Sequence, residues 1–387
     1  MNKLPNISKN IFCPITHTRK FKKIFSIKKF PIFMGVSNSR ANYEFLNLNW
    51  WINEVSGNVQ IHPKVPLEKL YFKPHGSGTV GKTWKDHHDL FFKLVCRYLN
   101  GNICEIGGGQ NSVLNRINSF SKIKKFYCFD KNLKLNKKIK KIKKIKKFFN
   151  KDYFKNKFIS IDLLIHSHTF EHLYDPDKFL KDVRSILSKN GKHIFTMPNM
   201  EPMIMKGYSN AMNFEHPFYY DEKLVDNLLI KNNFKIVKKI FFKEDHSIMY
   251  VTKKTNSVKK KINVSKNYNY LEYKKNLKLF KSMFSFWKKE IFKINRLIKK
   301  SEHVYIFGAH IFSQMMIFNG LNKKKIVGIL DNDKLKIGKY LYGTNFKIFE
   351  PSILKNIKNS CIILKAGSYN EEIKKQILKI NPNIKII

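Results

Sequence analysis

A carboxylate and an imidazole stand side by side at Glu215 and His216, in the stretch NFEHPFYY (213–220). Histidine has a pKa suited to removing a proton from a substrate near neutral pH, and a neighbouring carboxylate can orient it or stabilise its protonated form. The pattern therefore predicts an acid–base pair. The other interpretation is a polar pair in a surface loop, and this short stretch leaves both open.

A second cluster lies in HSHTFEH (166–172). His168, Glu171 and His172 have the H-x-x-E-H spacing of inverted zinc peptidases, which bind their metal from one face of a helix. Here these residues follow an apolar, strand-like run, and no motif for a third ligand stands nearby. We therefore expect no metal at this cluster.

The stretch EIGGG supplies a turn suited to ligand binding. Gly107, Gly108 and Gly109 follow an apolar run, where glycines let the backbone approach a ligand closely. Asp130 ends the next apolar run, at the spacing typical of a carboxylate that binds ribose hydroxyls. Glu105 precedes the glycines and completes the pattern. The G-x-G-x-x-G of dinucleotide sites is absent, which favours S-adenosylmethionine, a cofactor without a pyrophosphate.

Apolar runs alternate with helix-like segments through the middle of the chain, which predicts a doubly wound α/β sheet. We expect one helix in DPDKFLKDVRSILSKNG, ended by Gly191, and another in the lysine-rich run where Ile139, Ile142 and Ile145 recur every three residues. A second alternating unit begins at HVYIFGAH. The predicted organisation is a β-rich N-terminal lobe (1–74), a central domain (75–255), a linker helix (256–300) and a C-terminal Rossmann-like α/β domain (301–387).

With these motifs in this order, the region from about residue 80 to about residue 200 resembles class I methyltransferases that depend on S-adenosylmethionine. CEIGGG is similar to their first motif, Asp130 to their ribose-binding acid, and HTFEHLYDPDKFLKDVRSILSKNGKHIFTMPN to their fourth and fifth motifs. The resemblance implies a Rossmann-like sheet with S-adenosylmethionine as cofactor. It implies these cofactor-binding residues: Glu105, Gly107, Gly108, Gly109, Asp130 and His168.

Almost the whole chain is similar to the three-part sugar C-methyltransferases, which methylate C3 of nucleotide-linked 4-keto-deoxysugars. The resemblance implies that His216 is the base and Glu215 its partner, with His172 and Tyr71 as further catalytic residues. It also implies a role in glycan assembly, such as polysaccharide biosynthesis. The substrate-binding residues that it implies are His246, Ser247, Gly308, His310 and Asp331.

The chain departs from that family at two places. The family's N-terminal lobe binds zinc through two C-x-x-C pairs, whereas here only Cys13 remains and the second pair falls at Asn53 and Ser56. This loss argues against a bound zinc. The family tyrosine two positions before the glutamate is Asn213. The substrate, and whether carbon, oxygen or nitrogen is methylated, therefore stay open.

The net charge of +47 favours anionic partners. The 75 basic residues include only six arginines, and the lysines are spread along the whole chain, so we expect a nucleotide-sugar substrate and no specific nucleic-acid site. The alternatives are an RNA methyltransferase, a P-loop nucleotide-binding protein, since GSGTVGKT fits G-x-x-x-x-G-K-[ST], and a non-catalytic scaffold. The apolar runs are too short to span a membrane and the start lacks a signal-peptide pattern, so we expect a cytoplasmic protein without membrane insertion. The oligomeric state has no signature in the sequence.

Overall fold

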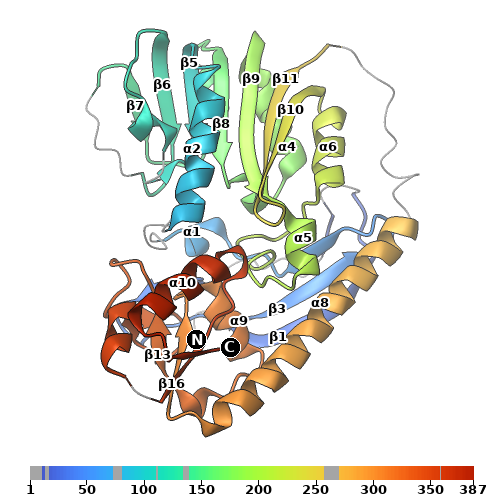
Figure 1. Cartoon of the computed structure of the whole chain (residues 1–387). Helices are drawn as coiled ribbons and strands as arrows, with labels where there is room; N and C mark the ends of the chain where they lie inside the picture. The colour runs from blue at the N-terminus through green and yellow to red at the C-terminus, as the bar shows by residue number, and fades with distance from the viewer. Residues whose placement is uncertain are drawn as a thin grey trace.

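The structure is a computed structural model of the chain, and it describes residues 11–13, 17–72, 81–109, 112–133, 139–256, 270–357 and 359–387. The central sheet lies at one end of the molecule and the C-terminal sheet at the other, with a long helix, α8, running along one side (Figure 1). None of the helices in the described ranges is long and apolar enough to cross a membrane.

The N-terminal part forms a three-stranded antiparallel sheet in the order β1-β3-β4. Its strands are β1 (Phe21–Pro31), β3 (Phe45–Asn53) and β4 (Val59–His62), and the short helix α1 (Leu67–Leu70) follows. Helix α8 (Tyr270–Leu297) packs across this sheet, where Phe25 stacks on Phe284 with ring centroids 4.1 Å apart. A two-residue strand, β2 (Val36–Ser37), pairs with β14 (Tyr340–Leu341) of the C-terminal part. The N-terminal sheet is therefore fastened to the rest of the chain through aromatic packing and strand pairing.

The central sheet has seven strands in the order β10-β11-β9-β8-β5-β6-β7. They are β5 (Gly101–Ile106), β6 (Ile123–Phe129), β7 (Ile142–Ile145), β8 (Ile161–Ser167), β9 (Leu187–Pro198), β10 (Phe234–Phe242) and β11 (Ser247–Lys254). Strand β11 runs antiparallel to both of its neighbours, and the other ladders are parallel. This order, with one reversed strand beside the last, is the Rossmann-like arrangement of class I methyltransferases, so the predicted fold class is confirmed.

Helices cover both faces of the central sheet, as buried parallel strands require. They are α2 (Lys82–Cys96), α3 (Asp152–Lys155), α4 (Pro176–Ile186) and α6 (Glu222–Lys231), whereas α5 (Met200–Met205) lies beyond the end of the sheet, next to α8 (Figure 1). Leu163 of β8 belongs to the buried cluster that includes Phe91 of α2. The next residue, Leu164, belongs to the cluster that includes Leu180 of α4. Alternate side chains of one strand thus face the two helix layers.

The C-terminal sheet has five parallel strands in the order β15-β13-β12-β16-β17. They are β12 (His303–Phe307), β13 (Ile326–Leu330), β15 (Ile348–Phe349), β16 (Ser360–Ile363) and β17 (Lys385–Ile386), with helices α9 (Ile311–Phe318) and α10 (Asn370–Ile380). The strand order reverses between β12 and β16, which is the position where open α/β sheets bind ligands.

Two local expectations are wrong. The isoleucine-rich run forms an edge strand at Ile142–Ile145, parallel to β6, where its lysines stay solvated. Helix α4 ends at Ile186 and β9 starts at once, so Gly191 lies within a strand. A Cβ at Gly191 would lie 2.9 Å from the carbonyl oxygen of Ile161, so glycine is needed there for close strand approach and not as a helix cap. After the glycine turn, Val113–Arg116 makes a single 3₁₀ turn and not an α-helix.

Candidate active site at the carboxyl edge of the central sheet

The side chain of Glu105 supports the glycine turn that follows β5. This buried carboxylate accepts hydrogen bonds from the Val113 backbone N–H, at 2.7 Å, and from the Ser112 hydroxyl. Burial raises the pKa of Glu105 to about 7. A Cβ added at Gly108 would lie 2.8 Å from the Glu105 carboxyl carbon, and Gly107 has a φ of +70°. Glu105 therefore shapes the turn, and the turn needs glycine.

Asp130 ties this turn to the end of β6. Its carboxylate accepts hydrogen bonds from the Gly109 N–H at 3.0 Å and from the Asn132 N–H at 2.6 Å. Partial burial raises the pKa of Asp130, against these two hydrogen bonds. Among the described residues, a Cβ at Gly109 would meet only the Asp130 carboxylate, at 3.7 Å. The turn thus leaves open space beside an acidic group, which suits a cofactor with a ribose.

His168 directly follows β8 and has a φ of +48°, a left-handed conformation that histidine adopts infrequently. Its Nδ1 lies 3.1 Å from an oxygen of Glu171, and its Nε2 lies 3.0 Å from the Ser247 hydroxyl at the start of β11. Glu171 is 1% exposed, and burial raises its pKa to about 7. This strained position therefore links the ends of two strands.

Tyr71 and His172 form a pair beside this edge. The Tyr71 hydroxyl lies 2.7 Å from His172 Nδ1, which also lies 3.0 Å from the backbone carbonyl of Glu215. Because a carbonyl only accepts, His172 carries its proton on Nδ1, and the Tyr71 oxygen accepts in this pair. Burial and the nearby Glu215 carboxyl raise the pKa of Tyr71, so the phenol keeps its proton. Tyr71 thus remains a hydrogen-bond donor.

The loop that carries His216 is held by the N-terminal sheet. Its backbone pairs with β4, through Ile61 N–H to Pro217 carbonyl at 2.7 Å and Tyr219 N–H to Val59 carbonyl at 2.9 Å. Asn213 accepts hydrogen bonds at its side-chain oxygen from the N–H groups of Glu215 and His216, at 2.8 and 3.2 Å. The residue that departs from the family tyrosine is therefore the cap of this loop.

The orientation of His216 is set by a backbone carbonyl. Its Nδ1 lies 3.0 Å from the Asn210 carbonyl, so the proton sits on Nδ1 and the lone pair on Nε2. Burial lowers the pKa of His216, which keeps the ring neutral near pH 7. The His172 ring packs edge-on against it, with centroids 4.7 Å apart. His216 is thus a neutral imidazole with a basic nitrogen.

The acid that acts electrostatically on His216 is Glu171, whose charge raises the pKa of the histidine. Burial raises the pKa of Glu215 to about 8, so this carboxyl is protonated near neutral pH. Asn210 and Glu171 were absent from the residues expected to form the site. Asn210 contributes a backbone atom, which no residue pattern reveals, whereas the Glu171-His172 step was visible in the sequence.

Within the described part of the chain, two groups of side chains have atoms close enough to hold a metal ion. They are His87, His168 and His246, and Glu171, His172 and His216, with the atoms of each group within 4.8 Å of one another. In the first group, His168 and His246 contact Ser247, and His87 Nε2 lies 3.1 Å from the Thr196 hydroxyl. These rings are thus engaged with protein hydroxyls, and we assign no metal to them.

The remaining predicted substrate residues lie in the C-terminal sheet, outside the histidine cluster. Gly308 follows β12 with a φ of +103°, and His310 precedes α9. Asp331 accepts hydrogen bonds from the Ala309 N–H at 2.7 Å and from Lys336 at 3.1 Å. This turn repeats the arrangement of Asp130 with Gly109 in the central sheet.

Asn53 fills the position of the second expected cysteine pair in the N-terminal lobe. Its side-chain oxygen accepts from the N–H groups of Val55 and Ser56 and from the Ser56 hydroxyl, and its amide donates to the Thr18 hydroxyl at 2.8 Å. Cys13 is buried. An amide-centred turn thus occupies the positions that would carry zinc ligands in the resembled family.

The start of α2 is occupied by a carboxylate from the C-terminal part. Glu372 of α10 accepts from the N–H groups of Lys82 and Thr83, at 2.7 and 3.1 Å. These residues end the P-loop-like stretch, of which residues 76–80 lie outside the described ranges. The N–H groups that would bind a phosphate at this helix end already have an anionic partner.

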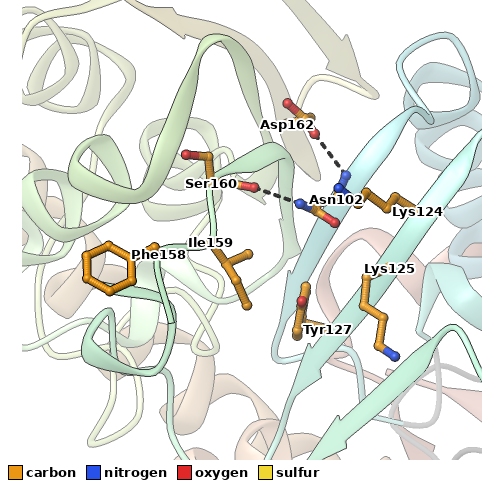
Figure 2. A pocket seen from close by; sticks show the side chains of 8 residues that line it. All are labelled: Asn102, Lys124, Lys125, Tyr127, Phe158, Ile159, Ser160 and Asp162. Atoms are coloured by element: carbon orange, nitrogen blue, oxygen red, sulfur yellow. Dashed lines mark hydrogen bonds between the residues drawn. The ribbon is translucent and has the colours of Figure 1, made fainter. Parts of the chain in front are cut away.

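A surface hollow of about 660 Å³ lies at the other edge of the central sheet. It is lined by Asn102, Lys124, Lys125, Tyr127, Phe158, Ile159, Ser160 and Asp162. Figure 2 shows Asn102 bridging Asp162 and Ser160 through hydrogen bonds, which join the starts of β5 and β8. This hollow is at the amino ends of the strands, away from the glycine turn, so it is not the candidate site.

Comparisons with known proteins agree with this geometry. Residues 82–239 match a family model described as a methyltransferase domain, and residues 300–387 match one described as C2185-like, N-terminal. No curated protein matches the chain.

Several solved structures are similar over part of the chain. A methyltransferase dependent on S-adenosylmethionine from Mesorhizobium loti is 13% identical with a TM-score of 0.35, and the match covers 44% of this chain and 98% of that one. One from Clostridium acetobutylicum ATCC 824 is 13% identical with a TM-score of 0.32, covering 46% and 93%. A structure named as a DhpI–SAH complex is 11% identical with a TM-score of 0.33, covering 45% and 87%. From the matched family model and the strand order of the central sheet, we conclude that residues 82–239 form a methyltransferase domain and that the protein is a methyltransferase enzyme.

Proposed function

We propose that this enzyme transfers a methyl group from S-adenosylmethionine to a nucleotide-activated keto-deoxysugar, at a carbon beside the ketone. The observation that carries the proposal is the tautomer of His216. The Asn210 carbonyl holds the proton on Nδ1 and leaves Nε2 as a base, next to the Tyr71–His172 pair. A base facing neutral donors is the arrangement that forming an enolate requires.

S-adenosylmethionine is the cofactor, and when bound it supplies an electrophilic methyl group. The family match and the class I strand order both support it. The open glycine turn at Gly107–Gly109 and the Asp130 carboxylate would hold its amino-acid and ribose parts. These two features lie at the carboxyl edge of the sheet, the edge from which His168 and His172 also project.

The side chains of the site divide the chemistry between them. His216 Nε2 removes the proton next to the substrate ketone. The Tyr71 hydroxyl, held by His172, donates to the enolate oxygen and so stabilises the charge that develops there. Glu215 is protonated near neutral pH and adds no charge that would repel an enolate.

The sugar's nucleotide would bind the turn between β12 and α9. Gly308 leaves open space there, since a Cβ would meet nothing within 4 Å among the described residues. Asp331 holds the turn, and His310 precedes the helix. His246 and Ser247 lie at the start of β11, where His246 contacts Tyr369 of the C-terminal part, and they would contact the sugar side of the substrate.

The test uses calorimetry and turnover together. Wild type should bind S-adenosylmethionine and methylate a nucleoside-diphosphate 4-keto-6-deoxyhexose, with loss of the C3 hydrogen. His216→Ala should abolish turnover and leave cofactor affinity nearly unchanged, while His303→Ala, at an exposed histidine, changes neither. Turnover retained in His216→Ala, or turnover without cofactor binding, would refute the proposal. Methylation of RNA and not of the sugar would make the protein an RNA methyltransferase, the alternative that the net charge of +47 favours.

A further inference from the structure

A row of polar side chains leads from the candidate site to the C-terminal sheet. Glu171 contacts His168 at 3.1 Å, His168 contacts the Ser247 hydroxyl at 3.0 Å, and that hydroxyl contacts His246 Nδ1 at 2.6 Å. The last step joins His246 Nε2 to the Tyr369 hydroxyl at 3.4 Å. Each imidazole contacts the preceding group of the row through Nδ1 and the following group through Nε2.

Ser247 fixes the direction of hydrogen bonding along this row. A hydroxyl donates only one hydrogen, so it donates to one imidazole and accepts from the other. If it donates to His246, both histidines carry their proton on Nε2. If it donates to His168, both carry it on Nδ1. The two rings therefore share one tautomer, and passage of a single proton converts one arrangement into the other.

Aromatic rings pack against this row. The Trp84 ring lies edge-on to His168 and His246, with centroids 4.9 and 4.8 Å away, and stacks near Tyr369 at 6.3 Å. Burial lowers the pKa of both His168 and His246 to about 3, so both are neutral near pH 7. The titratable groups that face the row are His87, His88, His172, His216, Tyr71, Lys243, Asp245 and Glu372.

The inner end of the row adjoins the proposed base. Glu171, His172 and His216 have ligand-type atoms within 4.8 Å of one another, a separation that one water molecule can bridge. The second oxygen of Glu171 is buried and makes no hydrogen bond with the described residues. A carboxyl in this place can take a proton on that oxygen.

We propose that Glu171, His168, Ser247, His246 and Tyr369 form a proton relay, which carries the proton collected by His216 out to the half-buried phenol of Tyr369, in the turn directly before α10. The inference rests on the proposed function, because it needs a reaction that removes a proton from the substrate. These five are positioning and transfer groups that act through His216 and do not touch the substrate carbon.

The proton balance closes along the row. His216 Nε2 takes the proton from the substrate carbon. The electron pair left on that carbon would form the bond to the methyl group, while the S–CH3 bond of S-adenosylmethionine would break and leave S-adenosylhomocysteine. The proton then passes to the free oxygen of the Glu171 carboxylate, and rotation of the protonated carboxyl group turns this O–H toward His168 Nδ1, which accepts the proton. His168 Nε2–H moves its proton to Ser247, Ser247 moves its own to His246 Nδ1, and His246 Nε2–H moves its own to Tyr369 and from there to solvent. Glu171 ends as a carboxylate, His216 as a neutral base, and both histidines of the row as Nδ1–H tautomers. The two rings return to the Nε2–H form by proton exchange with solvent before the next turnover.

The first test needs no substrate. Imidazole ¹⁵N NMR of the whole protein with S-adenosylmethionine should show His168 and His246 in the same tautomer at every pH from 6 to 8. Both should switch from Nε2–H to Nδ1–H as Glu171 ionises, at a pKa of about 7. In Ser247→Ala, His246 should no longer follow His168. Opposite tautomers in wild type, or continued coupling in Ser247→Ala, would overturn the relay, even if the sugar proves to be the wrong substrate.

The second test measures where the proton goes. With S-adenosylhomocysteine and the 4-keto-6-deoxyhexose nucleotide deuterated at C3, wild type should wash the deuterium into solvent. Ser247→Ala and Tyr369→Phe should reduce the wash-out rate, divided by the rate of methyl transfer measured separately with S-adenosylmethionine, by about 10-fold or more, since the deuteron returns to the same carbon. Ser247→Thr should restore it because it retains the hydroxyl. Thr196→Val removes a buried hydroxyl that contacts His87 outside the row, and it should not change the ratio. An unchanged ratio in both relay variants would overturn the proposal, whereas no wash-out in wild type would refute only the proposed substrate.

Discussion

The contact between Glu372 and the first turn of α2 joins the methyltransferase domain to the C-terminal sheet. Figure 1 shows α10 beneath the start of α2. Gly81 precedes the helix without a side-chain cap, and the first turn contains no acidic residue. The carboxylate of Glu372 therefore serves as the cap that the helix itself lacks. We predict that Glu372→Gln loosens this turn.

The expected cost follows from the two hydrogen bonds. A carboxylate that accepts from Lys82 at 2.7 Å and Thr83 at 3.1 Å makes charge-assisted bonds, whereas glutamine offers one neutral oxygen. Loss of a helix cap costs about 0.5–2 kcal/mol, and loss of an anion near the helix N-terminus about 0.3–1 kcal/mol. Glu372 is half-buried, so solvent screens part of this. We therefore expect about 1–2 kcal/mol, or roughly 5–30-fold in the opening equilibrium.

Amide hydrogen exchange measures this directly. Protection of the Lys82 and Thr83 amides should fall by about 5–30-fold in Glu372→Gln, while the amides of β5 keep theirs. Glu371→Gln, at the exposed neighbour, is the matched control and should leave both unchanged. Equal effects of the two variants, or unchanged protection in Glu372→Gln, would refute the assignment of Glu372 as the cap. ATP should give no thermal stabilisation of wild type, because the same N–H groups already have a partner.

Other predictions test the lobes and the buried acids. Asn53→Ala removes a fully buried amide that makes hydrogen bonds with Thr18, Val55 and Ser56. It should lower the unfolding free energy, measured in urea, by about 1–3 kcal/mol. An unchanged urea midpoint would argue against the amide as the centre of this lobe. Gly57→Ala places a Cβ 2.5 Å from the Tyr273 backbone nitrogen at a φ of +71°, so it should displace α8 and lower the melting temperature. Gly338→Ala is the control, because Gly338 also has a positive φ but an added Cβ would meet no atom within 4 Å, and it should lower the melting temperature less. Burial raises the pKa of Glu105 and Glu171 to about 7 and of Glu215 to about 8, so the stability that their protonated forms contribute is present below the unfolded pKa near 4.5 and is lost as pH rises through 7 and 8. The buried histidines, whose pKa values are lowered, act in the opposite direction over this interval, so the test compares wild type with Glu215→Gln. The variant should lose about 2 kcal/mol of the fall in unfolding free energy between pH 6.5 and 9 that the Glu215 carboxyl causes, and equal pH slopes in the two proteins would contradict the assignment. Asp130→Asn should weaken S-adenosylmethionine binding by about 5–30-fold in calorimetry, because the carboxylate both holds the Gly109 turn and faces the ribose; unchanged affinity would place the ribose elsewhere.

The central sheet was predictable because its signals are local. Buried parallel strands read as continuous apolar runs, and the glycine turn and Asp130 each stand directly after such a run. The lysine-rich run was misread for the same reason. Isoleucines three apart fit one face of a helix, but Ile142 and Ile145 are set by pairing with Phe126 and Phe129 of β6, which is a non-local contact.

The residue types of the site were also visible, whereas their roles were not. The sequence placed Glu215 beside His216, yet a backbone carbonyl at Asn210 orients the imidazole, and Glu171 is the acid whose charge acts on it. Backbone atoms carry no residue identity, so no pattern could indicate that contact. Tyr369 lies 123 residues from His246, and Glu372 lies 290 from Lys82, so their partnerships exist only in the fold.

These contacts make the flanking parts of the chain components of the proposed site. Strand β4 pairs with the loop that carries His216, so the N-terminal sheet sets the position of the proposed base. The C-terminal part contributes Tyr369, the outer group of the relay, and Glu372, the cap of α2. Helix α2 in turn carries Trp84, whose ring packs against His168. Removing the N-terminal sheet would therefore free the loop of the proposed base, and removing the C-terminal part would remove the outer group of the proposed relay. The methyltransferase domain alone would retain the glycine turn and Asp130 but lose these supports. Changes in the flanking parts should therefore reduce proton removal and leave cofactor binding, whereas changes at the glycine turn or Asp130 should reduce cofactor binding.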